Sequence, residues 1–242
     1  MAFIDLTAKA YKPAGGFYTS EVQAPTQSWD RPLPVRTFLP HGYEPRYPYP
    51  LLVFFHGQGG NEEQILRLAP RLSRRNFICI GLRGPVNVGP SRDGALGYSW
   101  GGESNTTLLE DYLVRAVQQT RANYHVHSER VYLAGFAEGA TVAYRLGLSM
   151  PEKLGGVISL NGAMPRHGRP LFRLPTIRSL RVFIGHGLAN AVVPLTLAKE
   201  DYRLLYTAGA HSSLNVYPVN HRIHPDMLRD INRWIIARCN ED

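Results

Sequence analysis

The stretch from residue 131 to residue 140 limits the fold more than any other part of the sequence. It opens with the apolar run Val131–Ala134, which predicts a buried strand, and from Glu138 it continues into a segment with a helical pattern. Gly135 and Gly139 flank the connection and allow a tight, crowded turn. A strand that turns directly into a helix is typical of an open sheet with helices packed on its faces.

Strand-like and helix-like segments alternate along nearly the whole chain. Apolar runs predict strands at residues 35–39, 51–55, 77–82, 130–134, 156–162, 181–184 and 214–218. Helices are expected to start near residues 61, 106, 138, 193 and 225, and the first of them is expected to kink or stop at Pro70. This alternation predicts an α/β fold with a doubly wound, mostly parallel sheet.

The domain organisation follows from the same pattern. We expect one α/β domain over residues 32–242, preceded by an N-terminal extension over residues 1–31 with room for edge strands. Residues 84–106 are predicted to be a long glycine-rich loop beside a cleft, because Tyr98 and Trp100 favour a packed loop.

Four segments stand where a parallel sheet places its ligand site. They follow residues 55, 135, 185 and 218, and each comes at the carboxyl end of a predicted strand. Ligands of open α/β sheets bind outside these ends. We therefore expect the four segments to converge on one cleft.

Each of the four segments also matches a motif. His56–Gly60 reads H-G-x-G-G, Gly135–Gly139 reads G-F-A-x-G, Gly185–Pro194 reads G-H-G-x-x-N-x-V-V-P, and Asn220–Pro225 reads N-H-x-I-x-P. In this order and strand context the set resembles the α/β-hydrolase superfamily, and within it the phospholipase/carboxylesterase (acyl-protein-thioesterase-like) family. The resemblance covers about residues 33–240. It implies an α/β-hydrolase fold in a single domain without a large lid.

The resemblance further implies a reaction and the residues that carry it. The family cleaves esters or thioesters of small or lipid-like acyl groups by a Ser-His-Asp route, without a metal or an organic cofactor. It places the catalytic histidine at His221. It places the backbone N–H groups of Gln58 and Glu138 in an oxyanion hole, which stabilises developing negative charge. The other residues expected in the cleft are His56, Gly57 and Trp100.

Two positions of the implied triad depart from the family pattern. Ala137 stands at the nucleophile position, and losing the serine hydroxyl costs on the order of a million-fold in turnover. Asn190 stands at the acid position, where an amide cannot stabilise an imidazolium and is expected to favour the wrong imidazole tautomer, a change worth roughly 10⁴-fold in a triad. The alternative acid position, near Asn161, carries no carboxylate. Ordinary serine hydrolysis is therefore predicted to be lost or very weak, with His221 as the triad side chain that remains.

Several explanations of these departures stay open. The chain could be a naturally degenerate hydrolase that keeps its cleft for a small ester-like or acyl ligand, or for another chemistry. It could be an active carboxylic-ester hydrolase with an engineered serine-to-alanine change at position 137, which leaves Asn190 unexplained. Another side chain could replace the nucleophile or base, with Tyr98, Ser99 and Glu138 as candidates. A protein-interaction module that uses the emptied cleft is a further alternative.

Charge and cysteine content argue against several other classes of protein. The formal charge is +8, but the basic residues are scattered, so no nucleic-acid partner is expected. Arg166, Arg169 and Arg173 could rim the cleft. Cys79 and Cys239 lack metal-ligand spacing, so no metal is expected and a reduced cytoplasmic setting is the simplest one. No apolar run reaches the roughly 20 residues of a membrane span, and the sequence indicates no oligomeric state.

Overall fold

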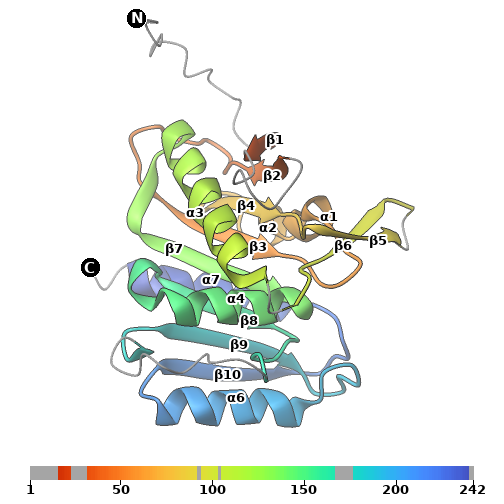
Figure 1. Ribbon diagram of the computed structural model, residues 1–242. Helices are drawn as coiled ribbons and strands as arrows, with labels where there is room; N and C mark the ends of the chain where they lie inside the picture. Colours follow the sequence, from red (N-terminus) through yellow and green to blue (C-terminus); the bar gives the residue numbers. More distant parts are fainter. Residues whose placement is uncertain (1–15, 23–31, 92–93, 103–104, 167–176, 240–242) are drawn as a thin grey trace, which may run out of the picture.

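The computed structural model describes residues 16–22, 32–91, 94–102, 105–166 and 177–239. In these residues one sheet of eight strands has the order β1-β2-β4-β3-β7-β8-β9-β10 (Figure 1). Its strands are β1 (Phe17–Val22), β2 (Leu33–Phe38), β3 (Tyr49–Phe55), β4 (Ile78–Leu82), β7 (Val126–Phe136), β8 (Gly156–Leu160), β9 (Arg181–Gly187) and β10 (His211–Tyr217). Neighbouring strands in the part of this order that runs β4-β3-β7-β8-β9-β10 pair in parallel. At the other edge, β1 pairs antiparallel with β2, and β2 pairs antiparallel with β4. The predicted doubly wound, mostly parallel sheet is confirmed.

Helices cover both faces of this sheet. They are α1 (Glu62–Leu66), α2 (Ala69–Leu72), α3 (Thr106–Asn123), α4 (Glu138–Ser149), α6 (Leu195–Thr207) and α7 (Pro225–Cys239), with a 3₁₀ helix at Pro151–Lys153. One apolar core joins α3, α4 and α6 to the sheet, and a second joins α1, α2 and α7 to the other face (Figure 1). Of the helices in the described ranges, none has both the length and the hydropathy to cross a membrane.

The central strand β3 shows why its sequence is apolar throughout. Successive side chains of a strand point to opposite faces. Accordingly Leu51 and Val53 pack in the first core, whereas Leu52 and Phe54 pack in the second. All four side chains are at most 2% exposed. An uninterrupted apolar run is therefore what this position in the sheet requires.

The first helical segment is divided near Pro70, as predicted. Helix α1 ends at Leu66, and α2 begins at Ala69 with Pro70 in its first turn. Proline has no N–H to donate and is tolerated only at the start of a helix. The side chain of Asn61 caps α1, because its Oδ1 accepts the Gln64 N–H at 2.9 Å.

Residues 84–106 do not form the plain loop that the sequence predicted. They contain an antiparallel hairpin of β5 (Val86–Pro90) and β6 (Leu96–Ser99), which projects beside α1 (Figure 1). Its base is anchored to the turn after β3, since Tyr98 exchanges backbone hydrogen bonds of 2.9 and 2.8 Å with Gly59 and Gly60. Both strands are short and carry glycines, and β5 is mostly exposed, so their brief apolar alternation is too weak to identify a strand.

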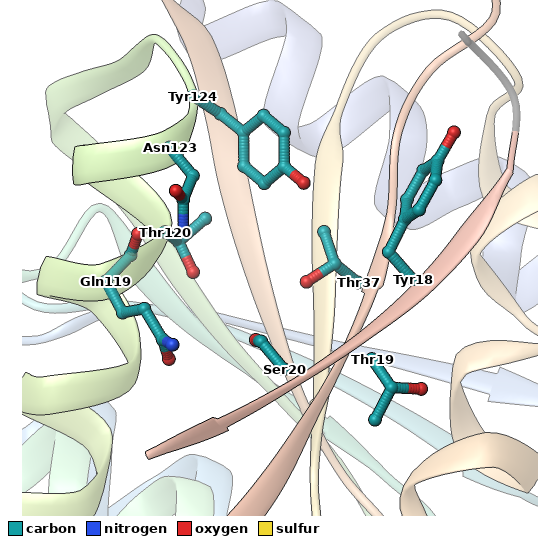
Figure 2. Close-up of a pocket in the computed structure, with 8 residues that line it drawn as sticks. All are labelled: Tyr18, Thr19, Ser20, Thr37, Gln119, Thr120, Asn123 and Tyr124. Carbon is teal, nitrogen blue, oxygen red and sulfur yellow. Dashed lines mark hydrogen bonds between the residues drawn. The ribbon is translucent and has the colours of Figure 1, made fainter. Parts of the chain in front are cut away.

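The N-terminal extension is described only over residues 16–22, which include β1 at the edge of the sheet. Helix α3 packs beside β1 and leaves a small polar cavity between them, of about 20 Å³. Figure 2 shows the side chains that line it: Tyr18, Thr19, Ser20, Thr37, Gln119, Thr120, Asn123 and Tyr124. Such a volume accepts about one water molecule, and the hydroxyl and amide groups suit one.

Candidate functional site

Residues from all four predicted segments line one open cleft with a volume of about 890 Å³. The segment after β3 contributes His56–Gly60, and the turn after β7 contributes Phe136–Glu138. Val192 and Val193 come from the loop after β9, and His221 comes from the segment after β10. The carboxyl ends of these parallel strands therefore meet at one site. In the described residues no group of three or more His, Cys, Asp and Glu side chains is arranged to hold a metal ion.

The turn between β7 and α4 keeps the strained form of a nucleophile elbow. Ala137 sits at its apex with φ 52° and ψ −116°, a conformation that costs a non-glycine residue of order 1–3 kcal/mol. Its N–H donates to the Leu160 carbonyl at 3.0 Å. A side chain at Gly135 would overlap the Gly139 backbone, and one at Gly139 would overlap the Phe55 carbonyl. The glycines are needed because α4 approaches the end of β3 this closely.

The two backbone segments predicted to form an oxyanion hole lie next to each other. A Cβ atom on Gly57 would stand 3.4 Å from the Cβ of Ala137, so the turn carrying Gln58 packs directly on the elbow. Glu138 is the first residue of α4, where a backbone N–H has no acceptor within the helix. Both Gln58 and Glu138 line the cleft. Their role as paired donors remains a prediction.

His56 supports this turn from within the protein. Its side chain is buried, its Nδ1 lies 2.8 Å from the Gly57 carbonyl oxygen, and its Nε2 accepts the Gly84 N–H at 2.9 Å. The acceptor role of Nε2 places the proton on Nδ1. Burial lowers the pKa of His56 to about 4, so the ring is neutral at pH 7.

The sequence predicted that Trp100 lines the cleft, but in the structure it is not among the residues that line it. Its indole is 1% exposed and donates from Nε1 to the His56 carbonyl oxygen at 2.8 Å. The rings of Trp100 and His56 lie 4.9 Å apart. Burying the large aromatic surface behind the cleft is more favourable than exposing it in the cleft. Trp100 therefore supports His56 and, through it, the turn with Gln58.

The residues at the last two triad positions are in direct contact. The Nδ1 of His221 lies 3.0 Å from the Oδ1 of Asn190. The same oxygen accepts the N–H groups of Val192 at 3.1 Å and Val193 at 3.0 Å. Two backbone donors point at this atom, so it must be the amide oxygen, and the facing Nδ1 of His221 must carry a proton.

This contact corrects the expected tautomer of His221. An amide nitrogen facing Nδ1 would have put the proton on Nε2, but Asn190 presents its oxygen instead. The Nε2 atom is therefore left as the free acceptor, as a general base requires. Burial lowers the pKa of His221, and the nearby His186 lowers it further, so the neutral ring is favoured. The ring packs against Phe136, with centroids 4.9 Å apart.

The candidate replacements for the nucleophile are committed to other contacts. The Ser99 hydroxyl donates to Glu138 Oε1 at 2.6 Å, and the Trp100 N–H donates to the same oxygen at 3.2 Å. The ring of Tyr98 lies 4.7 Å from the guanidinium of Arg83. Among the described residues that line the cleft, neither Ser99 nor Tyr98 is present. Glu138 lines the cleft, and its carboxylate accepts hydrogen bonds from Ser99 at the end of β6 and from Trp100 directly after it.

The arginines expected at the rim are only partly described. Arg166 forms an ion pair of 2.9 Å with the buried Asp201 and a longer one of 3.6 Å with Glu200. Its charge is therefore directed toward α6 and is partly neutralised there. Arg169 and Arg173 lie outside the described residues.

Comparison with known proteins places this fold and cleft in a family. Residues 45–238 match the sequence profile of the Phospholipase/Carboxylesterase family. The chain belongs to this family. The chain is 26% identical over 198 residues to the protein MhqD of Bacillus subtilis (strain 168). The matched region covers 81% of this chain and 97% of that protein. It is also 26% identical over 219 residues to acyl-protein thioesterase 1 of Mycosarcoma maydis, with 78% of this chain and 90% of that protein covered.

Solved structures bear out the fold of this phospholipase/carboxylesterase family member. Esterase PE8 superposes with a TM-score of 0.68 at 20% identity and covers 90% of this chain and 99% of its own. A carboxylesterase from Mesorhizobium loti superposes with a TM-score of 0.69 at 20% identity and covers 84% of this chain and 94% of its own. The α/β-hydrolase fold expected from the motifs is therefore confirmed, and the chain is a carboxylesterase-like hydrolase by family.

Proposed function

We propose that this chain does not perform ordinary serine hydrolysis and uses its cleft to bind small ester-like or acyl ligands. The observation that carries the proposal is Ala137 at the apex of an otherwise complete elbow, in a cleft that His221 also lines. A methyl group cannot form an acyl-enzyme intermediate. The elbow nevertheless keeps a backbone strain that a plain connecting turn does not require.

The cleft offers two kinds of contact to such a ligand. The N–H groups of Gln58 and Glu138 would hold a carbonyl oxygen, in the manner of an oxyanion hole. The rest of the wall is largely apolar and would hold a hydrocarbon chain. Its apolar side chains are Ile65, Leu68, Val88, Pro90, Phe136, Val192, Val193, Leu197 and Ile223. An uncharged carbonyl compound with an alkyl chain fits this combination.

Binding of 2-decanone, a ketone that cannot be hydrolysed, tests the proposal. In a titration followed by amide NMR, the N–H signals of Gln58 and Glu138 are expected to shift most, because the ketone oxygen accepts from them. Leu68→Trp places a larger side chain in the apolar part of the cleft. It should weaken binding by roughly tenfold, which corresponds to about 1.4 kcal/mol of binding free energy. Leu204→Trp changes an exposed leucine on α6 and is the matched control. Saturable binding with shifts only outside the cleft, or no binding, would overturn the proposal.

A second candidate function is that of an active ester hydrolase in which alanine has replaced serine at position 137. The orientation of Asn190 favours it, because the Nδ1–H tautomer of His221 is the one a serine nucleophile needs. The discriminating variant is Ala137→Ser. Full esterase turnover by that single variant would support this candidate over the first.

A further inference from the structure

Asn161 stands at a junction of three loops of the site. It follows β8, is fully buried, and has φ 51°, which asparagine tolerates better than most residues. Its Nδ2 donates to the carbonyl oxygen of Arg222 at 2.7 Å, directly after His221. Its Oδ1 accepts the Gly187 N–H at 2.8 Å, at the end of β9. One donor and one acceptor of the backbone thus fix which atom of the Asn161 amide is the oxygen.

This fixed oxygen faces the side chain at position 190. The Nδ2 of Asn190 donates to the Oδ1 of Asn161 at 3.2 Å. Both side chains are buried, so neither can turn to water to satisfy a lost partner. Position 190 must therefore present a donor toward Asn161 and an acceptor toward His221. Asparagine presents both, whereas an ionised aspartate presents only acceptors.

An aspartate at position 190 would find little compensation around it. Its second carboxylate oxygen would face the Asn161 oxygen, which cannot rotate away without losing the bonds to Gly187 and Arg222. The remaining neighbour is His186, whose Nε2 lies 3.3 Å from Asn190 Nδ2 and 2.8 Å from the Val193 carbonyl oxygen. A bond from His186 to the new carboxylate would weaken the bond to Val193.

We infer that Asn161 is a positioning residue that selects asparagine over aspartate at position 190, and so holds the His221 ring opposite an uncharged amide oxygen. Asn190 at the acid position is then one member of a hydrogen-bonded amide pair with Asn161, and not simply an aspartate that has lost its charge. The inference goes beyond the proposed function, because it concerns how the Asn190 and His221 side chains are held and not what the cleft binds. The amide pair itself is a matter of geometry, so its test can be read without any ligand or turnover.

A double-mutant cycle on Asn161 and Asn190 tests the inference. Asn190→Asp alone is expected to lower Tm by about 5 °C or more, because a buried carboxylate meets a fixed carbonyl oxygen. Asn161→Ser replaces that oxygen with a hydroxyl that can accept from Gly187 and donate to a carboxylate. In the Asn161→Ser background, the further loss of Tm caused by Asn190→Asp is expected to be clearly smaller. Equal losses in both backgrounds would overturn the inference, and Asn161→Gly repeats the cycle if the serine variant does not fold.

The histidine ring gives a second readout that a merely structural role would not move. In nitrogen NMR of histidine-labelled chain, His221 is expected to carry its proton on Nδ1 in the unmodified protein. The pKa of His221 should rise in Asn161→Ser/Asn190→Asp, since a carboxylate favours the charged ring. A proton on Nε2 in the unmodified chain would contradict the inference whatever the cycle gives. Failure of 2-decanone to bind would leave both readouts intact and would count only against the proposed function.

Discussion

The variant Ala137→Ser/Asn190→Asp is expected to hydrolyse p-nitrophenyl butyrate about 10⁴-fold to 10⁶-fold faster than the unmodified chain. The serine hydroxyl would stand at the apex of an elbow that is already formed, in the cleft that His221 lines, and His221 would keep Nε2 as the acceptor. The aspartate would supply the negative charge that stabilises an imidazolium, which Asn190 lacks. Initial rates with the acetate and butyrate esters measure the gain.

Single variants separate the two missing groups. Asn190→Asp alone has no nucleophile, so its rate should stay at the level of the unmodified chain. Ala137→Ser alone is expected to be intermediate, because its histidine has the right tautomer but no charged partner. The cost of that missing charge should be smaller than the roughly 10⁴-fold that accompanies a wrong tautomer. Equal rates for Ala137→Ser and the double variant would show that Asn190 is a competent acid-position residue and that one change alone had silenced the site.

Asn161 bears on the same series. Adding Asn161→Ser to the double variant is expected to increase its rate further, because the new carboxylate no longer opposes a fixed oxygen. A natural site with aspartate at position 190 would not need the donor–acceptor pattern that Asn161 now imposes. The pair therefore favours a site in which both amides belong to the natural sequence.

Acid is expected to destabilise the protein through His56. The pKa of this buried ring is about 4 in the folded chain and about 6.5 in an unfolded one, so the folded state binds fewer protons between these values. The contribution of the neutral His56 ring to the free energy of unfolding is therefore fully present above pH 6.5 and is lost as the pH falls toward 4. Protonation would also turn Nε2 into a donor facing the Gly84 N–H. Between pH 7 and pH 4.5 the loss amounts to about 2.5 kcal/mol.

Urea unfolding at several pH values measures this effect. His56→Gln removes the titrating group and, although less stable at pH 7, should show a flatter pH profile between 6.5 and 4. His211→Gln removes an exposed histidine and is the matched control. Parallel profiles for the unmodified chain and His56→Gln would mean that the acid sensitivity lies elsewhere.

The sequence predicted the fold well where one residue type has one structural use. The apolar run of β3 can be buried only between two helical layers, and Gly135 and Gly139 are needed where α4 meets β3. The hairpin of β5 and β6 escaped prediction because its pairing is set by distant contacts with Gly59 and Gly60. The local sequence pattern does not indicate hydrogen-bond partners that are distant in the sequence.

The site was predictable in membership but not in orientation. Motif order predicted that Ala137, Asn190 and His221 converge, and in the structure Ala137 and His221 line one cleft while Asn190 contacts His221. Which atom of Asn190 faces the ring depends on Val192, Val193 and Asn161, and no spacing rule reports an amide rotamer. The burial of Trp100 likewise follows from three-dimensional packing.

The formation of an acyl-enzyme tests the central claim most directly. The unmodified chain is mixed with excess p-nitrophenyl butyrate, and the first turnover is followed by p-nitrophenol release and by intact mass. With a methyl group at position 137, no burst of p-nitrophenol and no butyryl adduct should appear. A burst of about one p-nitrophenol per chain with a matching butyryl adduct, absent from His221→Gln, would contradict the account.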